Sequence, residues 1–189
     1  MDEIIQLDKD LFLYLNNLGT PLWDGFWLFM TEKINQAPLV LILLYFFYKY
    51  FGLRGTIITL VVVAALITVS DQLSNLFKNV IFMRPRPCQI EGVGEFTRFI
   101  AERCGRHGYF SAHASTTMGI AFFTGLALQK RLKYIFPFMV LWSVIVSYSR
   151  IYIGVHYPGD IITGMAIGIL LGLGAYKLHT FLVAKYGTQ

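Results

Sequence analysis

Charged side chains are scarce in this sequence of 189 residues. Lys, Arg, Asp and Glu make up 14% of the chain, whereas hydrophobic residues make up 56% and the mean hydropathy is +0.57. A soluble domain usually carries about a quarter charged residues. So large an apolar excess cannot be buried in one core of this size, and it also excludes disorder, collagen and a disulfide-dense scaffold. We therefore expect a single domain, residues 1–189, whose solvent is a lipid bilayer.

A continuous basic face is also missing, although the net charge is +5 and the isoelectric point is about 9.2. The lysines and arginines lie between apolar runs, so we predict no nucleic-acid partner. The bilayer is the predicted partner, and the sequence leaves the oligomeric state open.

Five stretches approach the roughly 20 apolar residues that a helix needs to span a bilayer. They lie at about 37–53, 55–77, 109–128, 134–153 and 158–178. These stretches predict an all-α fold, a polytopic membrane helical bundle. The last stretch carries Gly164, Gly168 and Gly172 four residues apart, a ridge of small residues suited to close helix packing.

Residues 1–34 have a different pattern, with Leu7, Leu11 and Leu15 at helical spacing among acidic and amide residues. We interpret this segment as helices lying in the membrane interface, anchored by Trp23 and Trp27. The alternative is a sixth, imperfect span.

Basic residues without acids mark one side of the predicted bundle, and this side should be cytoplasmic. They are Lys49, Arg54, Lys130, Arg131, Lys133, Lys177 and Lys185. The loop 83–108 then lies outside the cytoplasm, and it contains both cysteines, Cys88 and Cys104. An exported segment favours a disulfide between them, which would contribute about 3 kcal/mol. Two unrelated thiols are the alternative.

Polar groups gather at the outer ends of the spans, where each costs on the order of 3 kcal/mol and marks a functional candidate. The first group is Asp71, Asn75 and Lys78 on one helix face, followed by Arg84 and Arg86, each before a proline. Taken alone, this group would better suit a positive flank reaching lipid headgroups.

The second group opens the third span. Ser111 is a good N-cap, the N–H groups from Ala112 onward suit an anion, and His113 lies in the first turn. A capped helix with an interfacial histidine is the alternative.

The third group joins the last two spans and contains Arg150, His156 and Asp160. A carboxylate four residues after His156 can fix its tautomer and leave the other ring nitrogen as a nucleophile. A structural His–Asp cap would leave Arg150 unexplained. Cations, two histidines and a helix N-terminus on one membrane face together suit a tetrahedral, multiply charged anion such as phosphate.

Residues 149–160 match the pattern S-R-x3-G-x-H-x3-D at every fixed position. The sequence therefore resembles the type 2 phosphatidic acid phosphatase (PAP2) superfamily, which also includes vanadium haloperoxidases. Two motifs depart from the family pattern. The usual P-S-G-H is Phe110-Ser111-Ala112-His113 here, and the usual K-x6-R-P has seven residues between Lys78 and Arg86, or five before Arg84. We prefer Arg86 and keep Arg84 as the alternative; a one-residue bulge near the helix end would restore the spacing.

The resemblance implies a role for each matched residue. His156 would attack phosphorus, Asp160 would orient it, and His113 would protonate the leaving oxygen and then activate water. The phosphate would be held by Lys78, Arg86, Arg150, Ser111 and the Ala112 N–H. The resemblance implies no metal and no cofactor. Asp71 is a further candidate, paired with Lys78 or Arg150, or serving only as a helix contact.

These features predict an integral-membrane lipid phosphatase in a bacterial inner membrane, with its site facing the periplasm. By resemblance, undecaprenyl diphosphate is the first substrate expected and lipid A the next, followed by phosphatidylglycerophosphate or phosphatidate. A vanadate-dependent haloperoxidase and a non-catalytic lipid transporter are remote alternatives.

Overall fold

The computed structural model describes residues 2–187, which form helices and turns with no β-strand among them. Six helices carry the fold: α1 (Asp2–Asn17), α2 (Pro21–Thr31), α3 (Ala37–Leu76), α4 (Ala112–Leu128), α5 (Ile135–Tyr152) and α6 (Pro158–Tyr186). Four short turns join them: η1 (Ile34–Gln36), η2 (Phe77–Ile81), η3 (Pro87–Gln89) and η4 (Gly94–Phe96). The all-α expectation is confirmed.

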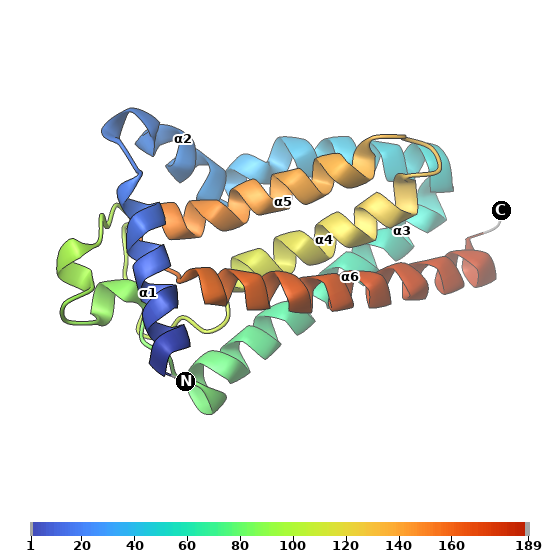
Figure 1. The fold of residues 1–189 in the computed structure, drawn as a ribbon. Helices are drawn as coiled ribbons and strands as arrows, with labels where there is room; N and C mark the ends of the chain where they lie inside the picture. The colour runs from blue at the N-terminus through green and yellow to red at the C-terminus, as the bar shows by residue number, and fades with distance from the viewer. Residues whose placement is uncertain (1, 188–189) are drawn as a thin grey trace.

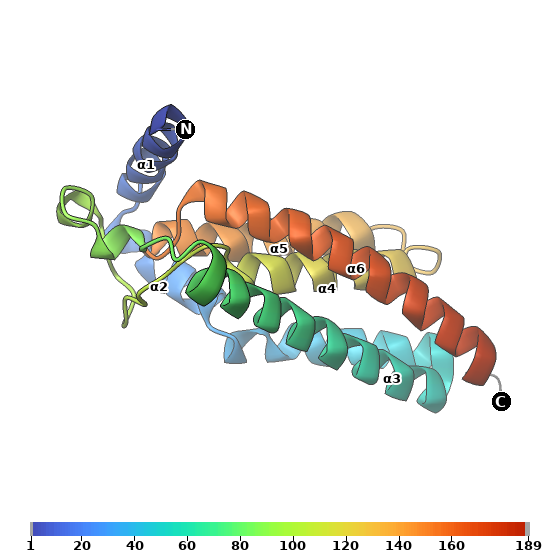
Figure 2. The same cartoon turned by 90° about the horizontal axis from the view of Figure 1, so that it is seen from below.

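The chain reverses direction inside α3. Gly52 has φ +66° and ψ −173°, a left-handed conformation that favours glycine because it has no Cβ. The two halves of α3 therefore run antiparallel along the bundle (Figure 1; Figure 2). They correspond to the first two predicted spans.

Within residues 2–187, three segments are long and apolar enough to cross a membrane: residues 34–81, α5 and α6. The protein is thus an integral membrane protein. α4 is slightly shorter, with 17 residues, and is enclosed by α3, α5 and α6. Five crossings, with the doubled α3 counted twice, remain a prediction.

The glycine ridge of α6 packs directly against the backbone of α4. A Cβ on Gly168 would lie 2.4 Å from the Ser115 carbonyl oxygen, and one on Gly164 would lie 2.6 Å from that of Ser111. Only glycine permits this approach, which brings the N-terminal ends of α4 and α6 together. The predicted close packing is confirmed.

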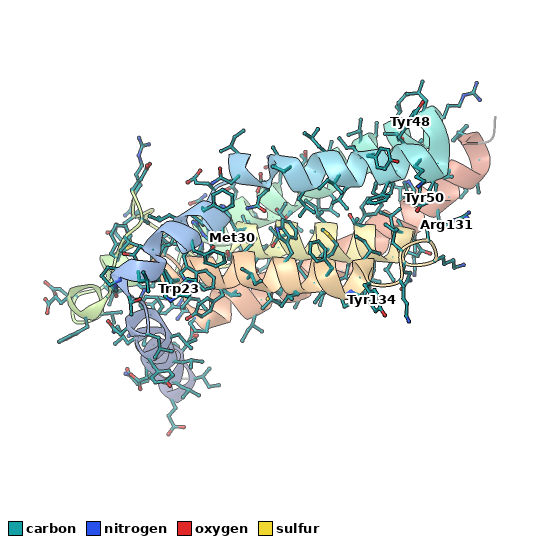
Figure 3. All side chains as sticks on the ribbon, turned by 90° about the horizontal axis from the view of Figure 1, so that it is seen from above. Trp23, Met30, Tyr48, Tyr50, Arg131 and Tyr134 are labelled. Atoms are coloured by element: carbon teal, nitrogen blue, oxygen red, sulfur yellow. A yellow bond between two sulfur atoms is a disulfide. The ribbon has the colours of Figure 1, made fainter. Side chains whose placement is uncertain are left out.

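The two ends of the bundle differ in composition. Tyr48, Tyr50, Arg131 and Tyr134 lie at one end, whereas Trp23 lies at the other (Figure 3). At the first end Lys49 and Arg131 both lie over the ring of Tyr50, 5.7 Å and 5.9 Å from its centroid. The predicted clustering of these two basic residues is confirmed, but its cytoplasmic side remains a prediction.

α1 lies across the opposite end of the bundle (Figure 1). One face of α1, formed by Asp8, Phe12 and Asn16, packs against the protein, and Phe12 and Asn16 are fully buried. The exposed surface of α1 includes apolar side chains, with Ile4 73% and Leu7 67% exposed, beside polar ones such as Asp10. This amphipathic arrangement supports the interfacial interpretation, which remains a prediction.

We predict that Gly168→Ala destabilises the protein by about 1–3 kcal/mol, because the new methyl group overpacks the contact with α4. Gly174→Ala is the matched control on the same helix, since a Cβ there meets nothing within 4 Å. Thermal unfolding in detergent measures both variants. Equal midpoints for the two would contradict the close helix contact.

Candidate active site

Lys78 lies in a π-helical turn, η2, that continues α3. Such a turn inserts one extra residue into a helix and is frequent at functional sites. It is the bulge that the seven-residue spacing between Lys78 and Arg86 called for. The ring of Phe77 packs against Phe110, with centroids 5.4 Å apart, so the turn is held beside the start of α4.

Arg86 is held by a short pairing between two parts of the long loop. Its N–H donates to the Arg106 carbonyl (3.3 Å), and the Gly108 N–H donates to the Arg84 carbonyl (2.8 Å). The Arg86 Nε also donates to the His107 carbonyl at 3.1 Å. This pairing directs the Arg86 side chain toward the end of the helices.

The loop cysteines form a disulfide just beyond this pairing. Cys88 and Cys104, with Cα atoms 6.3 Å apart, are each two residues from a paired segment. The predicted disulfide is confirmed. It closes the base of the loop next to Arg86.

Gly108 lies where three predicted site residues meet. A Cβ at this position would be 3.2 Å from Arg86 Cγ, 3.2 Å from Asp160 Oδ2 and 3.5 Å from His156 Nδ1. The absence of a side chain therefore lets the loop approach the His156–Asp160 pair. Sequence reasoning missed Gly108, because nothing in the local pattern distinguishes it from an ordinary loop glycine.

Ser111 caps α4, as predicted. Its Oγ accepts from the Ala114 N–H at 3.4 Å, and its own N–H donates to the Asp160 carbonyl at 3.0 Å. The first helical bond of α4 runs from Ser115 N to Ser111 O, so the Ala112 and His113 N–H groups precede it. Such a helix start favours an anion.

His156 and Asp160 form a buried pair at the start of α6. The His156 Nδ1 lies 3.3 Å from Asp160 Oδ2, and the same oxygen accepts from the Tyr157 N–H at 3.1 Å. An ionised carboxylate only accepts, so Nδ1 carries the proton and Nε2 has its lone pair available. Gly154, with φ +86°, makes the turn before this pair and packs against Arg98 of the loop.

Positive charge surrounds the His156 ring. Burial lowers the pKa of His156 well below its usual range, and the charges of Arg86, Arg150 and Lys78 lower it further. Burial also lowers the pKa of Arg86, which nearby Asp160 opposes. The imidazole is therefore neutral at pH 7, the form that a nucleophile requires.

Arg150 and His113 complete the cluster. Arg150 lies in the last turn of α5 and donates from Nη1 to the Thr31 hydroxyl at the end of α2. His113 lies within electrostatic reach of Arg150, His156 and Lys78. The structure thus brings together the three predicted groups of polar residues, and Thr31 is a partner that the sequence did not reveal.

A largely apolar cavity of about 270 Å³ opens next to His113, between α3, α4 and α5. Asp71 lines this cavity together with Lys33 and Trp142. Among the ion pairs of the described residues, none joins Asp71 to Lys78 or Arg150. Of the roles considered for Asp71, direct pairing is therefore not observed.

The Arg84 side chain is bound to two carboxylates. It donates from Nη1 to Asp160 Oδ1 (3.1 Å) and from Nη2 to Asp8 Oδ2 (2.7 Å), and it lies over the Tyr157 ring. These contacts favour Arg86 as the motif arginine. Asp8 was missed because, in the sequence, it is one of several acids on an amphipathic helix.

Comparisons with known proteins identify the family of the chain. Residues 55–183 match the PAP2 superfamily, and the chain belongs to this family of phosphoric ester hydrolases. It is 34% identical to the lipid A 4'-phosphatase of Bacteroides thetaiotaomicron, over 92% of this chain and 76% of that protein. It is 32% identical to the enzyme of the same name from Porphyromonas gingivalis, over 98% and 78%. The lipid A 1-phosphatase of Rhizobium johnstonii is 34% identical over only 57% of this chain and 42% of its own length.

Two crystal structures share the fold. The transmembrane PAP2-type phosphatidylglycerolphosphate phosphatase of Bacillus subtilis aligns with a TM-score of 0.73 and 18% identity, covering 98% of this chain and 89% of its own. LpxE of Aquifex aeolicus aligns with a TM-score of 0.62 and 29% identity, covering 89% and 93%. The predicted PAP2-like helical core is confirmed.

We predict that Gly108→Ala lowers phosphatase kcat about ten-fold, because its methyl group crowds Arg86 and Asp160 and displaces the reacting imidazole. Gly25→Ala is a control, since a Cβ there meets nothing within 4 Å. Steady-state rates on a lipid phosphate measure the effect. Wild-type kcat in Gly108→Ala would show that this close approach is dispensable.

We predict that Cys88→Ser with Cys104→Ser raises KM more than it lowers kcat, because the loop that holds Arg86 becomes looser. The chain-entropy model also predicts a loss of about 3 kcal/mol of stability for a loop of this length. Kinetics and thermal unfolding of the double variant, compared with the wild type under reducing and oxidising conditions, test both effects. An unchanged KM would separate the disulfide from phosphate binding.

Proposed function

We propose that this protein removes a phosphate group from lipid A, at the 4' position, through a phosphohistidine intermediate. The choice of substrate rests on the share of the chain that is matched. The similarity to two lipid A 4'-phosphatases extends over more than nine-tenths of this chain. The similarity to the 1-phosphatase covers little more than half. Undecaprenyl diphosphate, the first substrate expected from the sequence, has no such support, and the comparisons favour the lipid A alternative.

The first chemical step follows from the tautomer of His156. Its Nε2 attacks phosphorus, forming a P–N bond as the bond to the leaving oxygen breaks. Asp160, paired with Nδ1, stabilises the positive charge that develops on the ring. His113, protonated once the anionic phosphate lies beside it, gives its ring proton to the leaving oxygen and is left neutral.

In the second step His113 takes a proton from water, and this water attacks the phosphohistidine. The P–N bond breaks, which releases inorganic phosphate and restores neutral His156. Lys78, Arg86 and Arg150 balance the phosphate charge in both transition states, with the first N–H groups of α4.

The surroundings of the site suit a lipid substrate. The cavity beside His113 has mostly apolar walls, so it is suited to the lipid portion attached to the leaving oxygen. α1 and α2 would lie in the interface at the same end of the bundle. We propose that this end faces the periplasm, because the opposite end carries Lys49 and Arg131 without acids nearby in the sequence.

The decisive experiment is phosphate release from a panel of purified lipids. The panel contains lipid A phosphorylated only at position 4', lipid A phosphorylated only at position 1, undecaprenyl diphosphate and phosphatidylglycerophosphate. We expect the 4' monophosphate to have the highest kcat/KM and His156→Ala to release no phosphate from any lipid while unfolding at the wild-type temperature. A preference for undecaprenyl diphosphate would refute the proposed substrate, and full activity of His156→Ala would refute the mechanism.

We also predict that activity survives EDTA, because the phosphate charge is balanced by Lys78, Arg86 and Arg150. Vanadate should inhibit, since it can adopt the five-coordinate geometry of the transition state. Initial rates with each reagent provide the measurement. Loss of activity on chelation, restored by a divalent metal, would contradict this assignment of charge.

A further inference from the structure

The Asp160 carboxylate depends on a residue from the far N-terminal part of the chain. Asp160 is fully buried, and its Oδ1 accepts from Arg84 Nη1 at 3.1 Å. Arg84 is in turn paired with Asp8, with 2.7 Å between Nη2 and Oδ2. A continuous chain of contacts therefore runs from α1 through Arg84 to Asp160 and then to His156.

Asp8 is fixed in place by more than this ion pair. Its second oxygen, Oδ1, accepts from the Gly159 N–H in the first turn of α6 at 2.8 Å. Farther along the same face of α1, Phe12 packs on Tyr157 with ring centroids 5.2 Å apart. Each oxygen of Asp8 thus has a separate partner, one in the helix start and one in Arg84.

We propose that Asp8 is a positioning residue of the phosphatase reaction, acting through Arg84 to hold Asp160 in line with His156. In a site that binds anions, the Arg84 guanidinium can bind either of two partners. It can stay hydrogen-bonded to Asp160, or it can turn toward a phosphate group. The pairing with Asp8 holds it on Asp160, so that the phosphate is left to the motif cations.

Asp8→Asn separates the two contacts of Asp8. The asparagine oxygen can still accept from Gly159 N–H, while its NH₂ group replaces the oxygen that faces Arg84 and sets donor against donor. We expect kcat to fall about ten-fold with KM changed less than two-fold, because supporting partners orient the reacting groups rather than bind the substrate. The substrate is the lipid phosphate that the wild type cleaves fastest.

Asp10→Asn is the matched control, since it removes the same charge from the same helix. Asp10 is exposed and accepts only from Gln6 within α1 among the described hydrogen bonds. We expect Asp10→Asn to retain the wild-type kcat. A fall in kcat equal to that of Asp8→Asn would attribute the effect to the charge of α1 and overturn the proposal.

A double-mutant cycle with Arg84→Gln tests the route of action. If Asp8 acts through Arg84, adding Asp8→Asn to Arg84→Gln leaves kcat unchanged. If the fold losses in kcat of the two single variants multiply in the double variant, or if Asp8→Asn changes only KM, the proposal is overturned. The inference rests on the proposed phosphohistidine mechanism, but the failures differ: an inactive wild type refutes the function, whereas an active wild type with a fully active Asp8→Asn refutes only the role of Asp8.

Discussion

The buried carboxylate of Asp160 is the constraint on which the site depends. A charge removed from water must be paired and hydrogen-bonded, since otherwise burial costs several kcal/mol. The partners of Asp160 are Arg84 from the long loop, the ring of His156 and the Tyr157 N–H. The long loop must therefore fold back onto the helix ends before Asp160 has all its hydrogen-bond partners. The same folding of the loop places Arg86 beside the candidate site.

The sequence predicted the parts of the fold and site that depend on local pattern. Apolar runs located the helices, and the motif from Ser149 to Asp160 indicated His156 as the candidate nucleophile, because the spacing of the motif is set by one turn and one helix start. Even the bulge near Lys78 was foreseeable, since a spacing that is one residue too long has few structural remedies. The turn at Gly52, by contrast, divides one long apolar segment into two halves. The number of membrane crossings therefore does not follow from helix length alone.

The parts that could not be predicted all depend on segments far apart in the chain. Asp8 and Arg84 are 76 residues apart, and Arg84 and Asp160 are separated by the same number. Gly108 matters only because Arg86 and the His156–Asp160 pair converge on it. Neither composition nor periodicity carries this information, because it arises when the disulfide-closed loop folds back onto the bundle.

α1 contributes to the support of the candidate site. Part of its exposed surface is apolar, whereas its inward face carries Asp8, Phe12 and Asn16. Asn16 donates to the carbonyls of Ile151 and Tyr152 at the end of α5. Because Asp8 accepts from Gly159 at the start of α6, this face is attached to both helices. If α1 lies in the membrane interface, as predicted, the same helix also places the support for Asp160.

The position of the cavity supports the different roles proposed for the two histidines. His113 lines the cavity between α3, α4 and α5, whereas His156 is buried against Asp160 and does not contribute to the lining. An in-line displacement needs the attacking and leaving atoms on opposite sides of phosphorus. If the lipid portion occupies this cavity, the leaving oxygen lies beside His113, and the proposed attack then requires the His156 ring on the far side of phosphorus. A neutral nucleophile on one side and a proton donor on the lipid side then divide the reaction as the proposed mechanism requires.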